Sequence, residues 1–249
     1  MIQVLSRALQ ILDLLGENPQ RAYSLSELAS SQSLDKGTCA NILKTLSSWG
    51  YVQQEAPRSG YKLGYRLYHL AGRPVENEEL SKIARRDIEL LGARLNETAM
   101  LSIVRNDRRI TLYNTIPDRE ILVRTSIDKS VYSACTGRAI IANYSPAHLE
   151  KLLIRIGLPE EGEWPEVTEA EHPEQALVNA LTEIRQKGYV LHHDANGIAG
   201  FSAPLFKEGH VAGAVGVYMP ESRLTDREAV LSAVLETARE INRKLTLSQ

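Results

Sequence analysis

Residues 24–52 read SLSELASSQSLDKGTCANILKTLSSWGYV, which predicts two short helices, a tight turn between them and a strand directly after the second helix. Ser24 and Glu27 have the spacing of a capping box, in which each side chain satisfies a backbone donor at the helix start. The turn is SQSLD, and the second helix is predicted to begin near Asp35. Gly50 is predicted to end it, because glycine readily adopts the left-handed conformation found after helices.

The second predicted helix has one apolar and one polar side. Its apolar residues recur at helical spacing and predict a buried stripe: Cys39, Ile42, Leu43 and Leu46. The outward set is small, polar and cationic: Lys36, Thr38, Asn41 and Lys44. Lysine can contact phosphates, and asparagine and threonine can contact base edges, so this face predicts binding in a groove of DNA.

A predicted hairpin follows the helix pair. Residues 51–53 and 61–63 alternate as two strands around EAPRSG. Arg58 lies at the hairpin tip, where a winged helix places a cation against the sugar-phosphate backbone, and Lys62 on the second strand is a further candidate DNA contact. The alternative is three ordinary amphipathic helices with a solvated Lys/Asn face. The hairpin, at the right place and distance, favours DNA binding.

Charge supports this interpretation only mildly. The first 72 residues carry seven Lys/Arg and five Asp/Glu, whereas the whole chain has a net charge of −2. A weakly basic N-terminal domain on an otherwise acidic chain suits sequence-specific DNA binding by a dimer better than non-specific electrostatic binding.

Length and composition indicate two ordinary globular domains. The chain has 249 residues, with 43% hydrophobic and 24% charged residues. It contains no apolar run of about 18 residues that could span a bilayer, and its amphipathic N-terminus lacks the features of a secretory signal. Cys39 and Cys135 fall in different predicted domains, so no structural disulfide is expected. We therefore expect a cytoplasmic protein without a membrane partner.

The composition shifts at residues 71–80, AGRPVENEEL, where glycine and proline interrupt the pattern before an acidic helix start. The domain boundary is predicted there. Apolar residues keep helical spacing from Glu76 to Leu95 and predict a linker helix, and the larger half after it alternates short strands with helices. Strands are expected at 99–104, 110–115, 121–125, 189–192, 201–206 and 211–218. Helices are expected at 137–143, 146–156, 173–188 and from the cap Thr225 to 244, with an acidic surface loop at 157–172. Antiparallel strands with helices on one side predict an α+β, sensor-like domain.

Several stretches, in this order and spacing, resemble the IclR family of transcriptional regulators: VLSRALQILDLL, LDKGTCANILKTLSSWGYV, YKLGYRLYHLA, YSACTGRAI, IRQKGYV, FSAPLFKEGHVAGAVGVYMP and SRLT. The resemblance covers nearly the whole chain. It implies a winged helix-turn-helix domain (1–72), a linker helix (73–95) and a GAF-like effector-binding and oligomerisation domain (96–249). It also implies a homodimer or homotetramer on palindromic operator DNA, acting as repressor or activator under control of a small metabolite.

The resemblance assigns recognition-helix roles to Lys36, Thr38, Asn41 and Lys44. The sequence departs from the family at Gly37, where serine is more usual, and at Ala40, where a larger side chain is typical. The polar residues around these two positions must therefore carry most of the base reading.

The resemblance also implies an effector site at the backbone amides of Cys135 and Thr136, ahead of Gly137. Free amides at the positive end of a helix favour anions independently of any family. The alternative is a plain helix start capped by the Thr136 hydroxyl.

Four further pocket positions differ from those of small-acid-binding members: His192, Gly200, Gly216 and Tyr218. His192 replaces an acidic residue, Gly200 a cysteine, and the other two replace hydroxyl-bearing residues. These changes predict added space and a bulkier effector, such as an aromatic or sugar-derived acid.

An enzyme using redox or hydrolytic chemistry in the larger half is the alternative function. His192 and His193 are adjacent on a predicted strand and point to opposite faces, so no metal site is expected there. Cys135 lacks a resolving partner or base, which favours packing over catalysis. We expect no cofactor, and the polar helix face with its wing favours the DNA-binding regulator.

Overall fold

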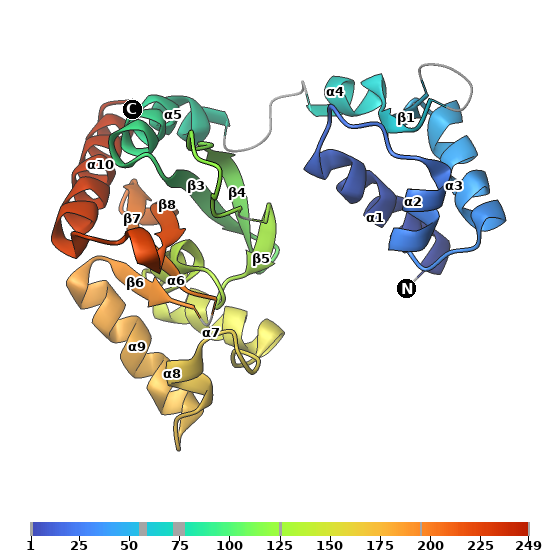
Figure 1. The fold of residues 1–249 in the computed structure, drawn as a ribbon. Helices are drawn as coiled ribbons and strands as arrows, with labels where there is room; N and C mark the ends of the chain where they lie inside the picture. Colours follow the sequence, from blue (N-terminus) through green and yellow to red (C-terminus); the bar gives the residue numbers. More distant parts are fainter. Residues whose placement is uncertain (1, 55–58, 72–77, 125, 195, 249) are drawn as a thin grey trace. The chain divides into compact units, whose positions relative to one another are not determined.

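The computed structural model describes residues 2–54, 59–71, 78–124, 126–194 and 196–248 (Figure 1). The chain divides into two compact units, residues 1–76 and 77–249. Arg58, the predicted wing-tip contact, lies outside the described residues.

The first unit is a helical domain with a two-stranded sheet. Its elements are α1 (Gln3–Glu17), α2 (Leu25–Ser31), α3 (Lys36–Ser48), β1 (Val52–Gln53), β2 (Lys62–Leu63) and α4 (Tyr65–Ala71). β1 and β2 pair in antiparallel fashion, with Val52 opposite Leu63. The helix pair followed by this hairpin confirms the predicted winged helix-turn-helix.

Local capping explains where the two central helices of this unit begin. Ser24 Oγ accepts a hydrogen bond from the Glu27 backbone N–H at 3.2 Å, and Glu27 Oε2 accepts one from the Ser24 N–H at 2.8 Å. Asp35 Oδ1 accepts from the Thr38 N–H at 2.8 Å and starts α3. Gly50, with φ of +75°, lies in the left-handed region just after the helix. The predicted capping box, helix start and glycine stop are confirmed.

The second unit is built on a six-stranded antiparallel sheet with strand order β5-β4-β3-β8-β7-β6. The strands are β3 (Thr98–Arg105), β4 (Arg108–Asn114), β5 (Asp128–Ser130), β6 (Val190–His193), β7 (Ile198–Lys207) and β8 (His210–Pro220). The helices are α5 (Glu78–Leu95), α6 (Cys135–Ile141), α7 (Pro146–Ile156), α8 (Pro165–Thr168), α9 (Pro173–Lys187), the 3₁₀ turn η1 (Glu221–Arg223) and α10 (Arg227–Leu247).

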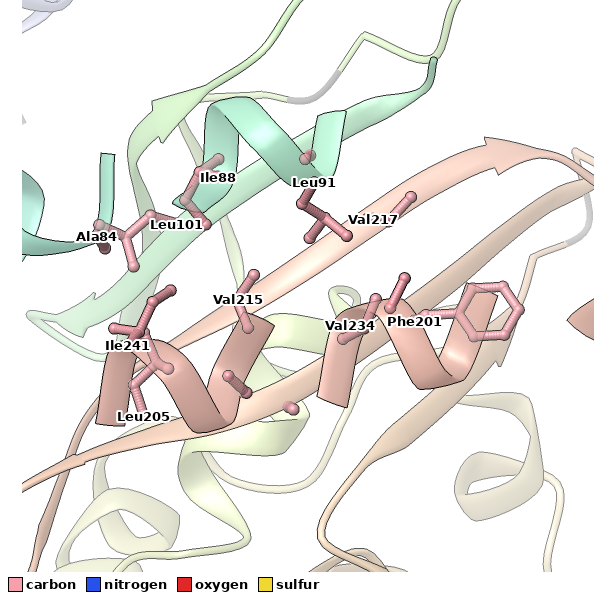
Figure 2. Packing of buried hydrophobic residues seen from close by; sticks show 14 of the residues in the cluster. Ala84, Ile88, Leu91, Leu101, Phe201, Leu205, Val215, Val217, Val234 and Ile241 are labelled. Atoms are coloured by element: carbon pink, nitrogen blue, oxygen red, sulfur yellow. The ribbon is translucent and has the colours of Figure 1, made fainter. Parts of the chain in front are cut away.

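One face of the sheet carries the larger apolar core, under α5 and α10. Figure 2 shows Ile88 of α5 and Val234 and Ile241 of α10 among Leu101 and Val217 of the strands. The helix expected between the two halves, α5, therefore packs within the second unit. Asp87 joins it to α10, because both of its carboxylate oxygens accept hydrogen bonds from Lys244 Nζ at 2.8 Å.

The opposite face is covered by α6, with α7 to α9 beyond it. Met100, Ala214 and Tyr218 on the strands form a second core with residues of these helices. The expectation of helices on one side only was therefore wrong. β7 and β8 each contain a run of seven consecutive buried residues, which is the pattern of a strand covered on both faces.

Three other expectations are corrected. No strand forms at 121–124, where Ile121 is 73% exposed; the edge strand is β5, whose polar residues give no alternating signal. α10 is capped by Asp226, which accepts from the Ala229 N–H at 2.9 Å, and not by Thr225. The acidic loop at 157–172 contains α8, and Trp164 within it is only 4% exposed because it packs on Arg138.

Candidate functional site

The candidate DNA-binding surface lies on α3. Lys36, Asn41 and Lys44 are exposed, Thr38 is half-buried, and the predicted apolar stripe faces the core of the first unit. Lys62 lies on β2 opposite Gln53, so the structure places it on the wing. Three of the four predicted outward residues are therefore exposed, whereas Thr38 is partly covered, and the second wing strand lies where the sequence predicted it.

Gly37 leaves the start of α3 unobstructed. A Cβ built there meets only Asp35 Oδ1, at 3.1 Å, and the residue is exposed. The neighbouring Ala40 is half-buried. Gly37 and Ala40 therefore add little side-chain volume to this surface, and the exposed side chains of Lys36, Asn41 and Lys44 are accessible beside them.

The candidate effector site lies between α6 and the sheet of the second unit. Among the described residues, four buried side-chain atoms have no hydrogen-bond partner: Arg109 Nε, Thr136 Oγ1, His192 Nδ1 and Tyr218 OH. Three of these residues were predicted from the sequence, and Arg109 was not. Unpaired buried polar atoms are costly, so native proteins rarely leave several of them in one region without a function.

The start of α6 differs from the sequence expectation. The helix begins at Cys135, two residues earlier than predicted, and its N-cap residue is Ala134, which has no side chain capable of capping. The alternative in which the Thr136 hydroxyl caps the helix was therefore wrong. Thr136 is fully buried, and its hydroxyl is without a partner.

Three glycines permit the close packing of this region. A Cβ on Gly137 would lie 2.3 Å from the Val131 carbonyl oxygen, so a larger residue cannot fit there. A Cβ on Gly216 would lie 2.7 Å from Thr136 Cγ2, and one on Gly200 would lie 3.1 Å from both Cys135 Sγ and a Tyr218 ring carbon. The expectation that the last two glycines leave space was wrong, because side chains of the protein occupy it.

Cys135 is fixed by a hydrogen bond from the sheet, and its thiol is buried and protonated. Its carbonyl oxygen accepts a hydrogen bond of 2.8 Å from Ser202 Oγ on β7. Burial raises the pKa of the Cys135 thiol above its ordinary value, which keeps the sulfur protonated at neutral pH.

The two adjacent histidines of β6 have opposite environments, as predicted. His192 is 9% exposed, and burial, helped by the nearby Arg138, lowers its pKa to about 4, so the imidazole is neutral at pH 7. His193 is exposed, and its Nδ1 lies 2.5 Å from Glu221 Oε1. Across the described ranges, no group of three or more His, Cys, Asp or Glu residues could hold a metal ion.

Two buried arginines border this region, and they differ in how well they are satisfied. Arg138 Nε donates to the Tyr132 carbonyl at 2.6 Å and Nη2 to the Glu163 carbonyl at 2.8 Å, while its guanidinium lies 4.1 Å from the Trp164 ring centroid. Arg109 Nη1 donates to Thr111 Oγ1 and, at 3.1 Å, to the Ser126 carbonyl, but its Nε is unpaired. The sequence signal for a buried arginine was the adjacent Arg108-Arg109 pair, because neighbours on a strand face opposite sides and one of the two must therefore point inward.

A winged helix joined to an α+β domain with a buried polar cluster is the architecture of a ligand-controlled transcriptional regulator. The model of the IclR helix-turn-helix domain matches residues 4–56, and that of the bacterial transcriptional regulator IclR C-terminal domain matches residues 73–243. The chain belongs to the IclR family of transcriptional regulators.

Named relatives span almost the full chain. The chain is 29% identical to the glycerol operon regulatory protein of Streptomyces griseus over 98% of this chain and 96% of that protein. It is 26% identical to the HTH-type transcriptional regulator XynR of Escherichia coli, over 92% of this chain and 90% of the relative. Since family and relatives are regulators, the enzyme alternative is set aside.

Solved structures share the fold. An IclR homolog of Microbacterium hydrocarbonoxydans complexed with 4-hydroxybenzoate matches with a TM-score of 0.71 and 22% identity, covering 97% of this chain and 98% of that one. The Thermotoga maritima IclR matches with a TM-score of 0.68 and 21% identity, covering 98% and 99% of the two chains. Among the helices of the described ranges, none combines the length with the apolar character that a membrane span requires.

Proposed function

We propose that a small organic acid, bound between α6 and the sheet of the second unit, controls binding of this regulator to a palindromic operator. The observation that carries the proposal is the set of buried polar atoms without partners in that region, on Thr136, His192, Tyr218 and Arg109. A bound molecule with acceptors and donors would satisfy them and would recover part of the free energy that their burial costs.

The proposed effector site comprises the residues that the sequence indicated: Cys135, Thr136, Gly137, His192, Gly200, Gly216 and Tyr218. Thr136 and Tyr218 provide hydroxyl groups, and the neutral His192 can donate or accept a hydrogen bond. Because side chains fill the volume beside Gly200 and Gly216, the effector must displace the Thr136 and Tyr218 side chains to gain room. The 4-hydroxybenzoate bound by the Microbacterium homolog supports an aromatic acid as the first class to test.

On the DNA side, we propose that Lys36, Thr38, Asn41 and Lys44 enter the major groove while Arg58 and Lys62 contact the backbone from the wing. A palindromic operator requires two copies of this surface related by two-fold symmetry, which a homodimer or a homotetramer supplies. The domain boundaries proposed for this arrangement are 1–72 for DNA binding, 73–95 for the linker helix and 96–249 for effector binding and assembly. The protein is proposed to act in the cytoplasm.

The test is a band-shift titration of the full chain on its own upstream DNA at several salt concentrations, with and without 4-hydroxybenzoate and other organic acids. We expect saturable binding with a steep dependence on salt, and a change in apparent affinity with one of the acids. Binding without saturation or salt dependence would contradict the DNA-binding surface. Saturable binding that no acid changes would contradict the effector class alone.

A further inference from the structure

Arg109 presents its guanidinium on the effector side of the sheet. It pairs in the strand register with Val104 of β3, which packs against the core under α6, and directly opposed residues on antiparallel strands share a face. Its side chain is 1% exposed, so the charge has been withdrawn from water almost completely.

The charge of Arg109 is not balanced by an ion pair within the part of the chain that the structure describes. Its two hydrogen-bond acceptors, Thr111 Oγ1 and the Ser126 carbonyl, are both neutral. The nearby carboxylate of Asp128 is engaged by Arg108 at 2.5 Å on the exposed side. A buried cation without a counter-charge is unfavourable, because the interior does not replace the solvation that water supplied.

The surroundings of Arg109 are those of the proposed effector site. Arg109 lies beside the start of α6, because it pairs with Lys129 of β5, and the carbonyl oxygen of Val131, two residues further on, lies against Gly137. A Cβ on Gly216 would meet Thr136 Cγ2, and one on Gly200 would meet Cys135 Sγ and the Tyr218 ring, so these side chains gather between α6 and the sheet. The unpaired Nε, the Tyr218 hydroxyl and the Thr136 hydroxyl therefore belong to one region of the second core. Arg138, by contrast, donates to two carbonyls, lies over the Trp164 ring and has no atom among the buried unpaired ones, so it serves the packing around Trp164.

We propose that Arg109 binds the carboxylate of the effector and makes a negative charge on that molecule a requirement for binding. This inference rests on the proposed control by an organic acid and specifies how that acid is recognised. A carboxylate can accept hydrogen bonds from a guanidinium in its fork geometry, which balances the charge and pairs Nε at the same time. The Thr136 and Tyr218 hydroxyls then contact the rest of the carboxylate or its neighbouring atoms.

The experiment compares acids with neutral analogues of the same shape. Thermal-shift and calorimetric titrations of the full chain use benzoate against benzamide and 4-hydroxybenzoate against 4-hydroxybenzamide. We expect the acid of a pair to raise Tm and the amide to leave it unchanged. In Arg109→Met the acid should bind about 10- to 100-fold more weakly, the range expected for losing a hydrogen bond to a charged group. Arg109→Lys should restore part of the affinity.

Arg108→Met is the matched control, because Arg108 is the adjacent residue, is exposed and pairs with Asp128. It should leave binding of the acid unchanged. Without ligand, Arg109→Met should melt at the wild-type temperature or above it, since replacing an uncompensated buried charge with an apolar side chain is often neutral or stabilising. A Tm clearly below that of Arg108→Met would assign Arg109 to folding and overturn the proposal.

The remaining outcomes separate the two proposals. Equal affinity of wild type and Arg109→Met for an acid that changes DNA binding would overturn the role of Arg109 and leave the proposed function intact. Tighter binding of the amide than of the acid would overturn the charge requirement in the same way. If no acid shifts the wild type, the proposed control by an organic acid fails, and the role of Arg109 fails with it.

Discussion

Ser202 on β7 donates a hydrogen bond of 2.8 Å to the carbonyl oxygen of Cys135, the first residue of α6. Both residues are fully buried, and 67 positions separate them in the chain. This bond ties the first residue of α6 to the sheet, directly before Thr136 and Gly137.

Ser202→Ala should therefore weaken the attachment of the first turn of α6 to β7. We expect the free energy of unfolding to fall by about 1 kcal/mol, the usual net contribution of one hydrogen bond, as measured by urea denaturation. Ser232→Ala is the control, because that hydroxyl bonds to Glu236 on the exposed side of α10 and should change stability by less. Equal effects of the two substitutions would show that the buried bond does not hold the helix.

Stability should depend on pH through His192. Its pKa is about 4 in the folded chain against an ordinary 6.5, so between these values the unfolded chain binds a proton there that the folded chain does not. Lowering the pH from 6.5 to 4 therefore favours unfolding, by up to about 3 kcal/mol from this group. Urea denaturation of wild type and His192→Gln across this range should show a smaller loss in the variant.

His193→Gln is the matched control for this experiment, because His193 is the adjacent residue on the exposed face of β6. It should retain the wild-type dependence on pH. A His192→Gln variant that loses stability in parallel with wild type would mean that other groups account for the whole effect.

Gly216 should tolerate no side chain while Thr136 keeps its methyl group. A Cβ at position 216 would lie 2.7 Å from Thr136 Cγ2, so Gly216→Ala should destabilise the protein by about 1–3 kcal/mol through overpacking. Adding Thr136→Ser removes that methyl group and should recover part of the loss, although the Phe201 carbonyl oxygen remains 3.1 Å away. Strictly additive effects in the double variant would contradict direct contact between the two positions.

Asn41 and Lys44 should affect DNA binding in different ways. Both are exposed on α3, but an asparagine amide can read a base edge, whereas a lysine contacts phosphate. Asn41→Ala should cost about 1–3 kcal/mol on the operator and relax the preference at one base position. Lys44→Ala should weaken binding to all sequences and reduce the salt slope by about one. Band shifts on the operator and on scrambled DNA distinguish these outcomes.

The winged helix could be predicted closely because its signals are local. The capping box at Ser24, the cap at Asp35 and the stop at Gly50 act over a few residues, and apolar spacing marks the side of α3 that is buried. These interactions form within one or two turns of chain, so the sequence around them is sufficient to predict them.

The edge strand and the second helical layer could not be predicted in this way. β5 is only Asp128–Ser130 and pairs with β4 through backbone atoms, which leave no apolar pattern. The helical layer formed by α6 to α9 was missed, although β7 and β8 are buried along seven consecutive residues, the pattern of a strand covered on both faces. Glycine, alanine and serine interrupt the large apolar residues of these strands, so the run is not evident in the sequence.

For the effector region, the residue types were readable from the sequence, but their environments were not. The resemblance indicated Thr136, His192 and Tyr218, whereas the role of the glycines depends on atoms that arrive from other elements, such as Thr136 Cγ2 beside Gly216. Arg108 and Arg109 are the same residue type in neighbouring positions. Only the pairing of β4 with β3 decides which of them is buried and left without a counter-charge, because burial and partners depend on contacts between distant segments.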